Sequence, residues 1–175
     1  MDEMVKAALL KWPNVPACHG WLALDARGHW WLRDAAAQAV GPFAGGDPAA
    51  RGQRVEHAKL LEFIQRNYAA TEEGCWFFQN GPQRVYVELE AAPWIWRLAA
   101  DGTLTSHTGL DAVCRSSWLD EQGRLYADSE RGFGLVHSLD MHLAADLVEQ
   151  GRWQPTECPA QELPRRFNFV LNPQP

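Results

Sequence analysis

One short pattern of apolar and polar positions recurs at residues 24–30, 98–104 and 119–125. In each copy a leucine is followed four residues later by glycine and six residues later by a large apolar residue. This spacing is typical of a three-residue hairpin loop, a type I turn closed by a glycine with positive φ. The apolar residues that flank each loop should face each other: Leu24 with Trp30, Leu98 with Leu104, and Leu119 with Leu125. The glycines expected to have positive φ are Gly28, Gly102 and Gly123.

A further hairpin is predicted between residues 84–90 and 94–98, where apolar residues alternate on both sides. A two-residue loop at Ala91 and Ala92 matches the two apolar faces, whereas a one-residue slip mixes them. The expected pairs are Leu89 with Trp94, Val87 with Trp96, and Val85 with Leu98. Glu88 and Glu90 then share the opposite face, which we expect to be solvated, with Arg97 nearby.

Helical periodicity appears in two longer segments, 55–69 and 139–150. Ser138 is expected to cap the second of these helices, and Gly151 lies where a left-handed C-terminal cap belongs. A shorter helix is predicted over 3–11, and a mobile loop over 41–48. The sequence thus predicts one α+β domain, residues 1–175, built on an antiparallel meander of short β-hairpins with two or three helices.

Composition narrows the class of protein. With 46% hydrophobic and 22% charged residues, the 175-residue chain resembles ordinary globular proteins. A net charge of −6 offers no attraction to nucleic acid or anionic lipid, so neither a nucleic-acid nor a membrane partner is expected. The four cysteines are widely separated, and the first residues do not resemble an export signal. We therefore expect a cytoplasmic protein with reduced thiols.

The nine tryptophans are the outlier in composition. Most are expected in the core, because large aromatic side chains suit half-buried strands. Trp30 and Trp31 are adjacent in a predicted strand and must point to opposite faces. One of them is then exposed on an aromatic-lined sheet face or covered by a helix or a partner.

Four runs of the first half of the chain resemble an uncharacterised proteobacterial family that is known only as a domain of unknown function. They are WPNVP at 12–16, GWLALD at 20–25, FIQRNY at 63–68 and WFFQNGPQRVYV at 76–87. The resemblance implies a bacterial cytoplasmic protein. It implies no activity, cofactor or catalytic residue.

An unusually polar loop joins the predicted strands on either side of Asn80 and Gly81. Turn chemistry explains the Asn-Gly-Pro sequence, since these residues supply left-handed geometry and a stiff exit. The remaining polar side chains, together with the end of the preceding helix, could line a pocket for a carboxylate or amide group, because arginine binds planar anions through two hydrogen bonds. The candidate ligand-binding residues are Arg66, Asn67, Gln79, Asn80, Gln83 and Arg84.

Histidine and aspartate gather at 137–146, in the form of His137, Asp140, His142 and Asp146. On a helix His137 and His142 would lie roughly 140° apart, so they cannot ligate one metal ion from a single face. Only His142 and Asp146 share a face, and such a pair is more typical of a surface ion pair. No metal site, cofactor or catalytic set is predicted from these residues.

The sequence is compatible with two functions. The first is a non-catalytic binding or interaction module that holds a protein segment or a small polar ligand. The alternative is a small hydrolase or metal-assisted enzyme that uses His137 or His142, the nearby acids and a thiol.

Overall fold

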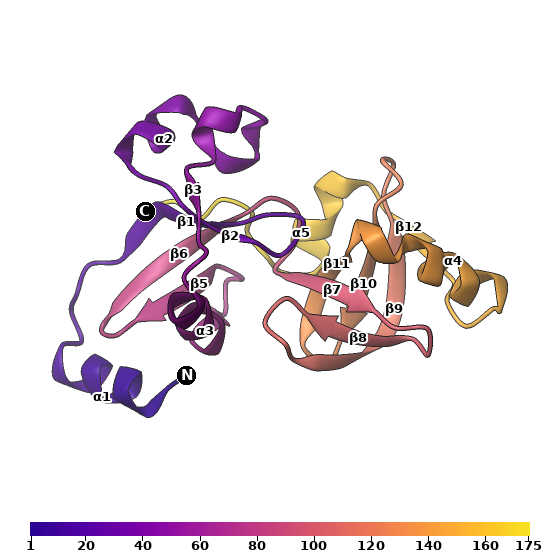
Figure 1. The fold of residues 1–175 in the computed structure, drawn as a ribbon, viewed down its shortest axis with the longest axis horizontal. Helices are drawn as coiled ribbons and strands as arrows, with labels where there is room; N and C mark the ends of the chain where they lie inside the picture. Colours follow the sequence, from indigo (N-terminus) through magenta and orange to yellow (C-terminus); the bar gives the residue numbers. More distant parts are fainter. The chain divides into compact units, whose positions relative to one another are not determined.

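The computed structural model describes residues 1–175 and divides them into two compact units (Figure 1). Unit 1 comprises residues 1–25, 29–90 and 169–175, and unit 2 comprises 26–28 and 91–168. The expectation of a single domain stays a prediction. None of the helices combines the length and the apolar character that crossing a membrane requires.

Unit 1 is built on a six-stranded sheet with the strand order β3-β2-β1-β6-β5-β4. All its neighbouring strands are antiparallel except β1 and β6, which are parallel. The elements of this unit are α1 Glu3–Lys11, β1 Cys18–Leu24, β2 Trp30–Leu32, α2 Ala35–Val40, the 3-10 turns η1 Phe43–Gly45 and η2 Pro48–Ala50, β3 Gln53–Arg54, α3 Ala58–Arg66, β4 Tyr68–Ala70, β5 Trp76–Asn80 and β6 Gln83–Leu89.

The first predicted hairpin is confirmed in β1 and β2. Leu24 pairs with Trp30, and Gly28 has a φ of 83°. Trp30 is buried, whereas Trp31 on the other face stays partly exposed beside Phe43. The alternation of side chains along a strand thus separates the two tryptophans, as the sequence predicts.

Helix α3 is shorter than the predicted helix over 55–69. The helix begins after His57, which is its N-cap. The Nδ1 atom of His57 accepts a hydrogen bond from the backbone N–H of Leu60 at 3.3 Å. Beyond Arg66 the chain turns into β4, where Tyr68 pairs with Phe78 of β5. An aromatic residue suits a strand at least as well as a helix, so sheet pairing takes over the last predicted turn.

The prediction of a mobile loop over 41–48 is wrong. An unpredicted helix, α2, precedes it and is capped by the Asp34 carboxylate, which accepts from Ala37 N–H at 2.9 Å. Two 3-10 turns follow, and the Phe43 side chain is only 1% exposed. Burial of this ring anchors the segment against the sheet.

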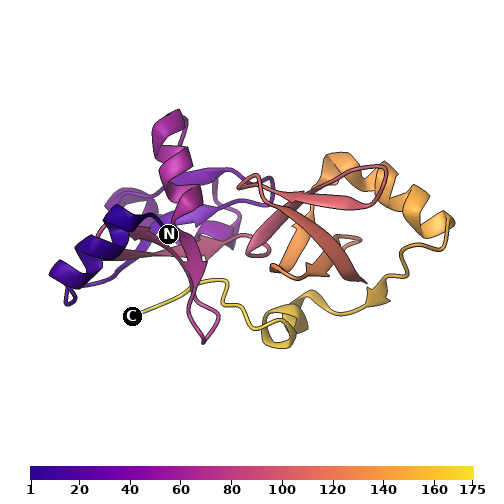
Figure 2. The ribbon, with the colours of Figure 1, turned by 90° about the horizontal axis from the view of Figure 1, so that it is seen from below.

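The last residues of the chain belong to unit 1. Val170 N–H donates to the Gly74 carbonyl at 3.0 Å, and Leu89 N–H donates to the Leu171 carbonyl at 2.7 Å. Figure 2 shows this C-terminal stretch, in yellow, as an extended strap without helix or strand. It brings Asn172 and Gln174 to the side of the sheet where β6 ends.

Unit 2 contains a closed five-stranded barrel with an extra edge strand. The order is β10-β11-β7-β8-β9-β12, and pairing of β9 with β10 closes the barrel. Strands β7 and β11 are parallel, as are β9 and β12. The elements of this unit are β7 Trp94–Leu98, β8 Thr103–Ser106, β9 Asp111–Leu119, β10 Leu125–Ser129, β11 Gly132–Val136, η3 Ser138–Asp140, α4 Met141–Glu149, β12 Thr156–Glu157, η4 Ala160–Glu162 and α5 Leu163–Arg166.

The other two hairpins predicted from the repeated pattern are confirmed in this barrel. Leu98 pairs with Leu104, and Leu119 pairs with Leu125. Gly102 and Gly123 have φ values of 89° and 75°. The local turn signal was sufficient at all three positions.

The hairpin predicted between 84–90 and 94–98 is wrong, because β6 and β7 belong to different sheets. Leu89 pairs with Leu24 in a parallel register, and Trp94 pairs with Gly134. The Ala-Ala-Pro connection lacks the glycine or asparagine that a two-residue turn requires. The α+β class is confirmed, but the strands form a meander only in part, since both sheets contain parallel pairs.

Helix α4 starts later than the predicted helix over 139–150. Residues 138–140 form a 3-10 turn, and its cap is His137 instead of Ser138, with Nδ1 accepting from Leu139 N–H at 3.1 Å. Gly151, with a φ of 70°, follows the helix as predicted. The five α-helices include two short ones, α2 and α5, that the periodicity did not indicate.

Candidate functional site

Two acidic residues emerge side by side at one edge of the sheet of unit 1. Asp25 directly follows β1 and Glu90 directly follows β6, and these parallel strands end in the register Leu24 with Leu89. Glu90 N–H also donates to the Leu24 carbonyl at 3.0 Å. Because the carboxyl ends of parallel strands meet at one edge, the chain places two like charges close together here. Such a pair needs positive or hydrogen-bonding partners.

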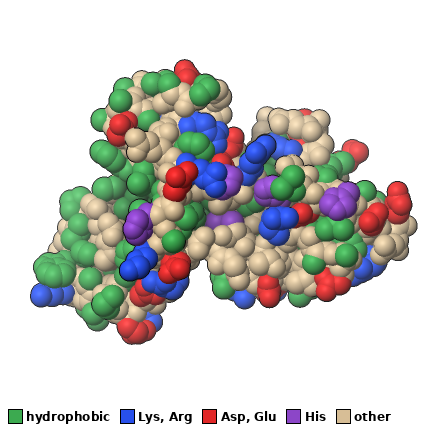
Figure 3. Space-filling view, viewed as in Figure 1, with side chains coloured by type: hydrophobic (Ala, Val, Ile, Leu, Met, Phe, Trp, Pro, Cys, Tyr) green, Lys and Arg blue, Asp and Glu red, His purple; other side chains and the backbone are tan.

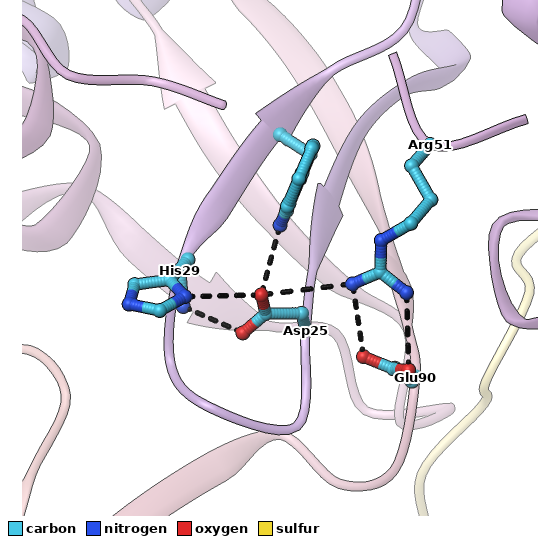
Figure 4. Close-up of polar contacts among 5 residues, drawn as sticks. Asp25, His29, Arg51 and Glu90 are labelled. Atoms are coloured by element: carbon cyan, nitrogen blue, oxygen red, sulfur yellow. Dashed lines mark hydrogen bonds and ion pairs between the residues drawn. The ribbon is translucent and has the colours of Figure 1, made fainter. Parts of the chain in front are cut away.

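The Asp25 carboxylate is buried and collects donors from the β1–β2 hairpin (Figure 4). Oδ1 accepts from His29 N–H at 2.8 Å, while Oδ2 lies 3.1 Å from His29 Nδ1 and accepts from Trp31 Nε1 at 3.0 Å. A carboxylate can only accept, so in the neutral ring His29 Nδ1 carries the proton and Nε2 is an acceptor. The His29 side chain is 33% exposed, which leaves this acceptor within reach of solvent.

Arg51 joins the two carboxylates, as Figure 4 shows. It binds Glu90 through two hydrogen bonds of 3.1 and 3.2 Å, and its Nη2 lies 3.6 Å from Asp25 Oδ2. The guanidinium also stacks over the rings of Trp31 and Phe43, at 4.8 and 4.5 Å from their centres. Charge pairing and cation–π contact therefore fix the end of the 41–51 segment. In Figure 3, acidic and basic side chains adjoin near the place where Figure 1 labels β2 and β3.

A second ion pair lies deeper in unit 1, between Arg33 and Glu88. Their side chains are 2% and 7% exposed, and Arg33 Nη1 donates to Glu88 Oε1. The expectation that Glu88 lies on a solvated face is wrong. A carboxylate can be buried here because Arg33 neutralises it and Phe43 N–H donates to its other oxygen at 3.1 Å.

The remaining donors of Arg33 bind backbone carbonyls of α2 and of the 41–51 segment. Nε donates to the Ala50 carbonyl at 2.7 Å, and Nη2 donates to the carbonyls of Ala37, at 3.3 Å, and Gly41. The buried guanidinium of Arg33 thus connects α2 and both ends of the 41–51 segment to Glu88 of β6. Together with Arg51, this pair makes the segment a fixed wall.

That wall borders a cavity of about 540 Å³ in unit 1. The floor contains the buried ion pair, and the sides come from β1, α2 and the C-terminal strap. The lining residues are His19, Gly20, Arg33, Gln38, Gly41, Pro42, Glu88, Asn172, Gln174 and Pro175. Apart from the ion pair, the polar side chains of this lining are three amides and one imidazole.

Glycine at position 20 lets Gln38 approach the strand. Gly20 has a φ of 78° at an irregular part of β1, and a Cβ there would lie 2.7 Å from Gln38 Oε1. Gln38 Nε2 donates to the Arg33 carbonyl at 3.0 Å, which orients the amide. On the opposite side Gln174 Nε2 donates to Asn172 Oδ1 at 2.7 Å.

The residues predicted to bind a ligand fall into separate groups. Arg66 and Asn67 surround Asp2, whose Oδ2 accepts from Asn67 Nδ2 at 3.2 Å and whose carboxylate lies 3.3 Å from Arg66 Nε. The hydrogen bond from Asn67 and the charge of Arg66 lower the pKa of Asp2. Arg66 therefore has a carboxylate of its own and helps to tie the N-terminus to α3.

Strand alternation separates the other predicted residues. Gln79 is paired with Arg84 on one face of β5 and β6, whereas Asn80 is paired with Gln83 on the other. Helix α3 packs on the second face, since Phe63 contacts Phe78 edge to face at 5.3 Å. Arg66 of α3 and Arg84 thus belong to opposite faces, so the six residues do not line one pocket. Whether any of them binds a ligand stays a prediction.

Their individual contacts support turn formation for several of these residues. Gln79 Nε2 donates to the Gly81 carbonyl at 3.1 Å, and Gly81 has a φ of 57° in the two-residue loop between Asn80 and Gln83. Gln83 Nε2 donates to the Pro16 carbonyl at 3.2 Å. Among the six predicted residues, Arg84 differs in that its guanidinium lies over an aromatic ring, that of Phe77, at 4.2 Å from the ring centre.

The residues of the hydrolase alternative are engaged in unit 2. Asp140 accepts from Arg97 Nε at 2.6 Å and from Leu98 N–H at 3.0 Å, and its pKa is lowered, chiefly by the Arg97 hydrogen bond. His137 caps η3, and His142 Nδ1 lies 3.1 Å from the Leu139 carbonyl. No three His, Cys, Asp or Glu side chains are grouped for a metal ion.

Sequence reasoning missed the residues that build the cavity and its wall. Arg33, Gln38 and Asn172 carry no motif, and their meeting depends on contacts between distant segments. Asp25 and Glu90 did offer a signal, because each is an acid directly after an apolar strand. Recognising the parallel pairing of those strands would have brought them together.

Two solved structures are similar to this chain. A DUF1285 family protein from Shewanella baltica OS155 is 15% identical, with 72% of this chain and 91% of that chain covered and a TM-score of 0.48. A DUF1285 family protein from Silicibacter pomeroyi DSS-3 is 14% identical, with 84% and 85% covered and a TM-score of 0.50, a likeness of fold alone. No curated protein matches the chain.

The family comparison covers nearly all of the chain. Residues 1–174 match the family described as "Protein of unknown function (DUF2946)". This match confirms the resemblance of residues 12–87 to an uncharacterised family. The chain therefore belongs to the DUF2946 family, whose function is unknown.

Proposed function

We propose that this protein is a non-catalytic binding module and that unit 1 holds a small polar ligand in the cavity above Arg33 and Glu88. The observation that carries the proposal is a cavity of about 540 Å³ floored by a buried ion pair and lined by amide side chains. Ligand pockets for small molecules are typically about 300–1,000 Å³. The volume therefore suits a small molecule better than a folded partner.

The lining favours a ligand that forms hydrogen bonds. Arg33 and Glu88 neutralise each other and have bonds to the backbone, so the cavity floor carries little net charge. The walls offer the amides of Gln38 and Asn172 and the imidazole of His19. Amides both donate and accept, which suits hydroxyl and amide groups on the ligand.

The fixed wall supports binding by reducing the entropy that ordering would cost. Gly41 and Pro42 line the cavity in a segment that is bound by Arg33 and Arg51 at both ends. A site that exists before the ligand arrives loses little conformational freedom on binding. We also propose a cytoplasmic location, supported by four cysteines that all carry free thiols.

A thermal-shift screen tests this function. The panel consists of free amino acids, hexoses and short hydroxy acids, applied to the wild type and to Gln38→Leu. A ligand of the native state raises the unfolding midpoint with increasing concentration. We expect panel compounds that stabilise the wild type to lose their effect on Gln38→Leu, which keeps the side-chain size but removes the amide.

The matched control is Gln161→Leu, an exposed glutamine of η4 in unit 2. It should respond to the panel like the wild type. Absence of any stabilising compound, or equal stabilisation of Gln38→Leu, would count against the proposed function.

A further inference from the structure

We infer that the ligand of unit 1 carries a carboxylate group and that Arg84 binds it at the end of a row of rings leading out of the cavity. This inference rests on the proposed function and adds the chemical class of the ligand. It also gives a role to Arg84, one of the six predicted ligand-binding residues, without requiring the other five.

The row follows one face of β6. Arg84, Tyr86 and Glu88 occupy alternate positions and therefore point to the same side of the sheet. Glu88 lies in the cavity floor, and His19, which lines the cavity, stacks on Tyr86 with ring centres 4.5 Å apart. Arg84 follows Tyr86 away from the cavity, with its guanidinium 6.0 Å from the Tyr86 ring centre.

Arg84 differs from the other arginines that are held in place in unit 1. Arg33, Arg51 and Arg66 each have a carboxylate within 4 Å, whereas no carboxylate lies that close to Arg84. Its guanidinium instead lies over the Phe77 ring at 4.2 Å, with Nη1 3.5 Å from the Tyr86 hydroxyl. A guanidinium that stacks on a ring uses its face for that contact, so the N–H groups along its edge can still donate hydrogen bonds.

These features suit a planar anion. Stacking on Phe77 holds the Arg84 guanidinium in place, and the edge of the guanidinium can donate two parallel hydrogen bonds to a carboxylate. The Tyr86 hydroxyl adds a donor beside it. The charge of Arg84 makes a small contribution to the lowered pKa of exposed Glu73, for which the Thr71 hydrogen bond is the largest cause.

The spacing also sets the size of the ligand. Arg84 and Glu88 are four positions apart along the strand, which corresponds to roughly 13 Å at about 3.3 Å per residue. A ligand with its polar body in the cavity and its carboxylate at Arg84 is then about as long as a dipeptide or a disaccharide acid.

Binding of matched acids and amides tests the inference. The probes are N-acetylalanylglycine and lactobionate, each compared with its primary amide by calorimetric titration. We expect the wild type to bind at least one acid roughly tenfold more tightly than its amide, the gain of about one charge-assisted contact. In Arg84→Gln this preference should disappear, so that the acid binds no more tightly than its amide.

Two further variants keep the result interpretable. Arg84→Lys keeps the charge but lacks the fork, so it should retain only part of the preference, and it covers the case that Arg84→Gln does not fold. Arg54→Gln removes an exposed arginine of β3 in the same unit and should behave like the wild type.

The outcomes separate this inference from the proposed function. Amide binding that depends on Gln38, without a preference for the acid or with a preference that survives in Arg84→Gln, overturns the role of Arg84 and leaves the cavity function standing. Failure of the acids and amides to bind at all overturns the inference as well. If inorganic phosphate displaces the acids at lower concentration than acetate does, the carboxylate assignment is wrong.

Discussion

Arg33 and Glu88 form a buried ion pair although 55 positions separate them in the sequence. The pair connects β6 with the 41–51 segment, because Arg33 binds the Ala50 carbonyl and Glu88 accepts from Phe43 N–H. The same contacts form the floor and one wall of the cavity. Stability of unit 1 and the shape of its candidate site therefore depend on the same two side chains.

Glu88→Gln should destabilise the protein strongly. Removing one partner of a buried ion pair leaves an uncompensated charge, at a cost of about 3–5 kcal/mol. Urea unfolding monitored by tryptophan fluorescence measures this loss. Glu90→Gln is the control, since the side chains of Glu90 and Arg51 are 30% and 26% exposed and such pairs contribute about 1 kcal/mol or less. If both variants lost a similar amount of unfolding free energy, burial of the Arg33–Glu88 pair would not explain the loss in Glu88→Gln.

Gly20→Ala should disturb the cavity as well as the backbone. A non-glycine residue at positive φ costs about 1–2 kcal/mol, and here the new Cβ also meets Gln38 Oε1. Gly46→Ala has the same backbone strain, with a φ of 86° and open space around the Cβ. We expect similar losses of unfolding free energy but weaker binding of panel compounds only in Gly20→Ala. Equal binding by both variants would exclude Gln38 from the site.

The hairpins could be predicted because their signals are local. Gly28, Gly102 and Gly123 lie within a few residues of the apolar pairs that they position. The 84–98 hairpin failed because matching of apolar faces does not identify the partner strand. Val87 pairs with Leu22 instead, a contact between segments far apart in the chain.

Asp140→Asn should lower stability in a way that depends on pH. The Arg97 hydrogen bond lowers the pKa of Asp140 from 3.8 in the folded protein, so its stabilising contribution is present above pH 4. It is lost as the pH falls below 4 and through the folded-state pKa. We expect a loss of about 1.5–3 kcal/mol at pH 7, as for a hydrogen bond to a charged group, and convergence with the wild type in acid.

Asp146→Asn is the matched control for this pH series, because Asp146 is an exposed residue of the same helix. Its unfolding free energy should follow the wild type at every pH. A difference between Asp140→Asn and the wild type that grows below pH 4 would contradict the assignment of Asp140 to the Arg97 pair.

Cys114 should resist alkylation in the folded protein. Burial, with a smaller effect from the charge of Asp128, raises the pKa of its thiol to about 11. At pH 8 only about one molecule in a thousand then carries the thiolate, which is the reactive form. Mass spectrometry after iodoacetamide treatment should find the Cys114 rate rising roughly tenfold per pH unit between 8 and 10.

The unfolded protein provides the reference for this measurement. All four thiols should be labelled there without a reductant, since none is in a disulfide. Fast labelling of Cys114 at pH 8 in the native protein would show that its surroundings are more open than the structure has them.

The candidate site itself was largely beyond sequence reasoning. Glu88 alternates with apolar residues as a solvated position does, and only the distant Arg33 makes its burial possible. The expected convergence of Arg66 and Arg84 could not be judged from the sequence for a different reason. The packing of α3 on Phe78 decides which face of β5 it covers, and no local pattern encodes that choice.

The most direct test of ligand binding in unit 1 is the nuclear magnetic resonance spectrum of the side-chain amides during titration with the panel compound that stabilises the protein most. The proposal predicts saturable shifts of the Gln38 and Asn172 amide signals, with the same dissociation constant for both. The Gln161 signals should not move. Binding without shifts at Gln38 and Asn172, or with equal shifts at Gln161, would contradict a ligand site above Arg33 and Glu88.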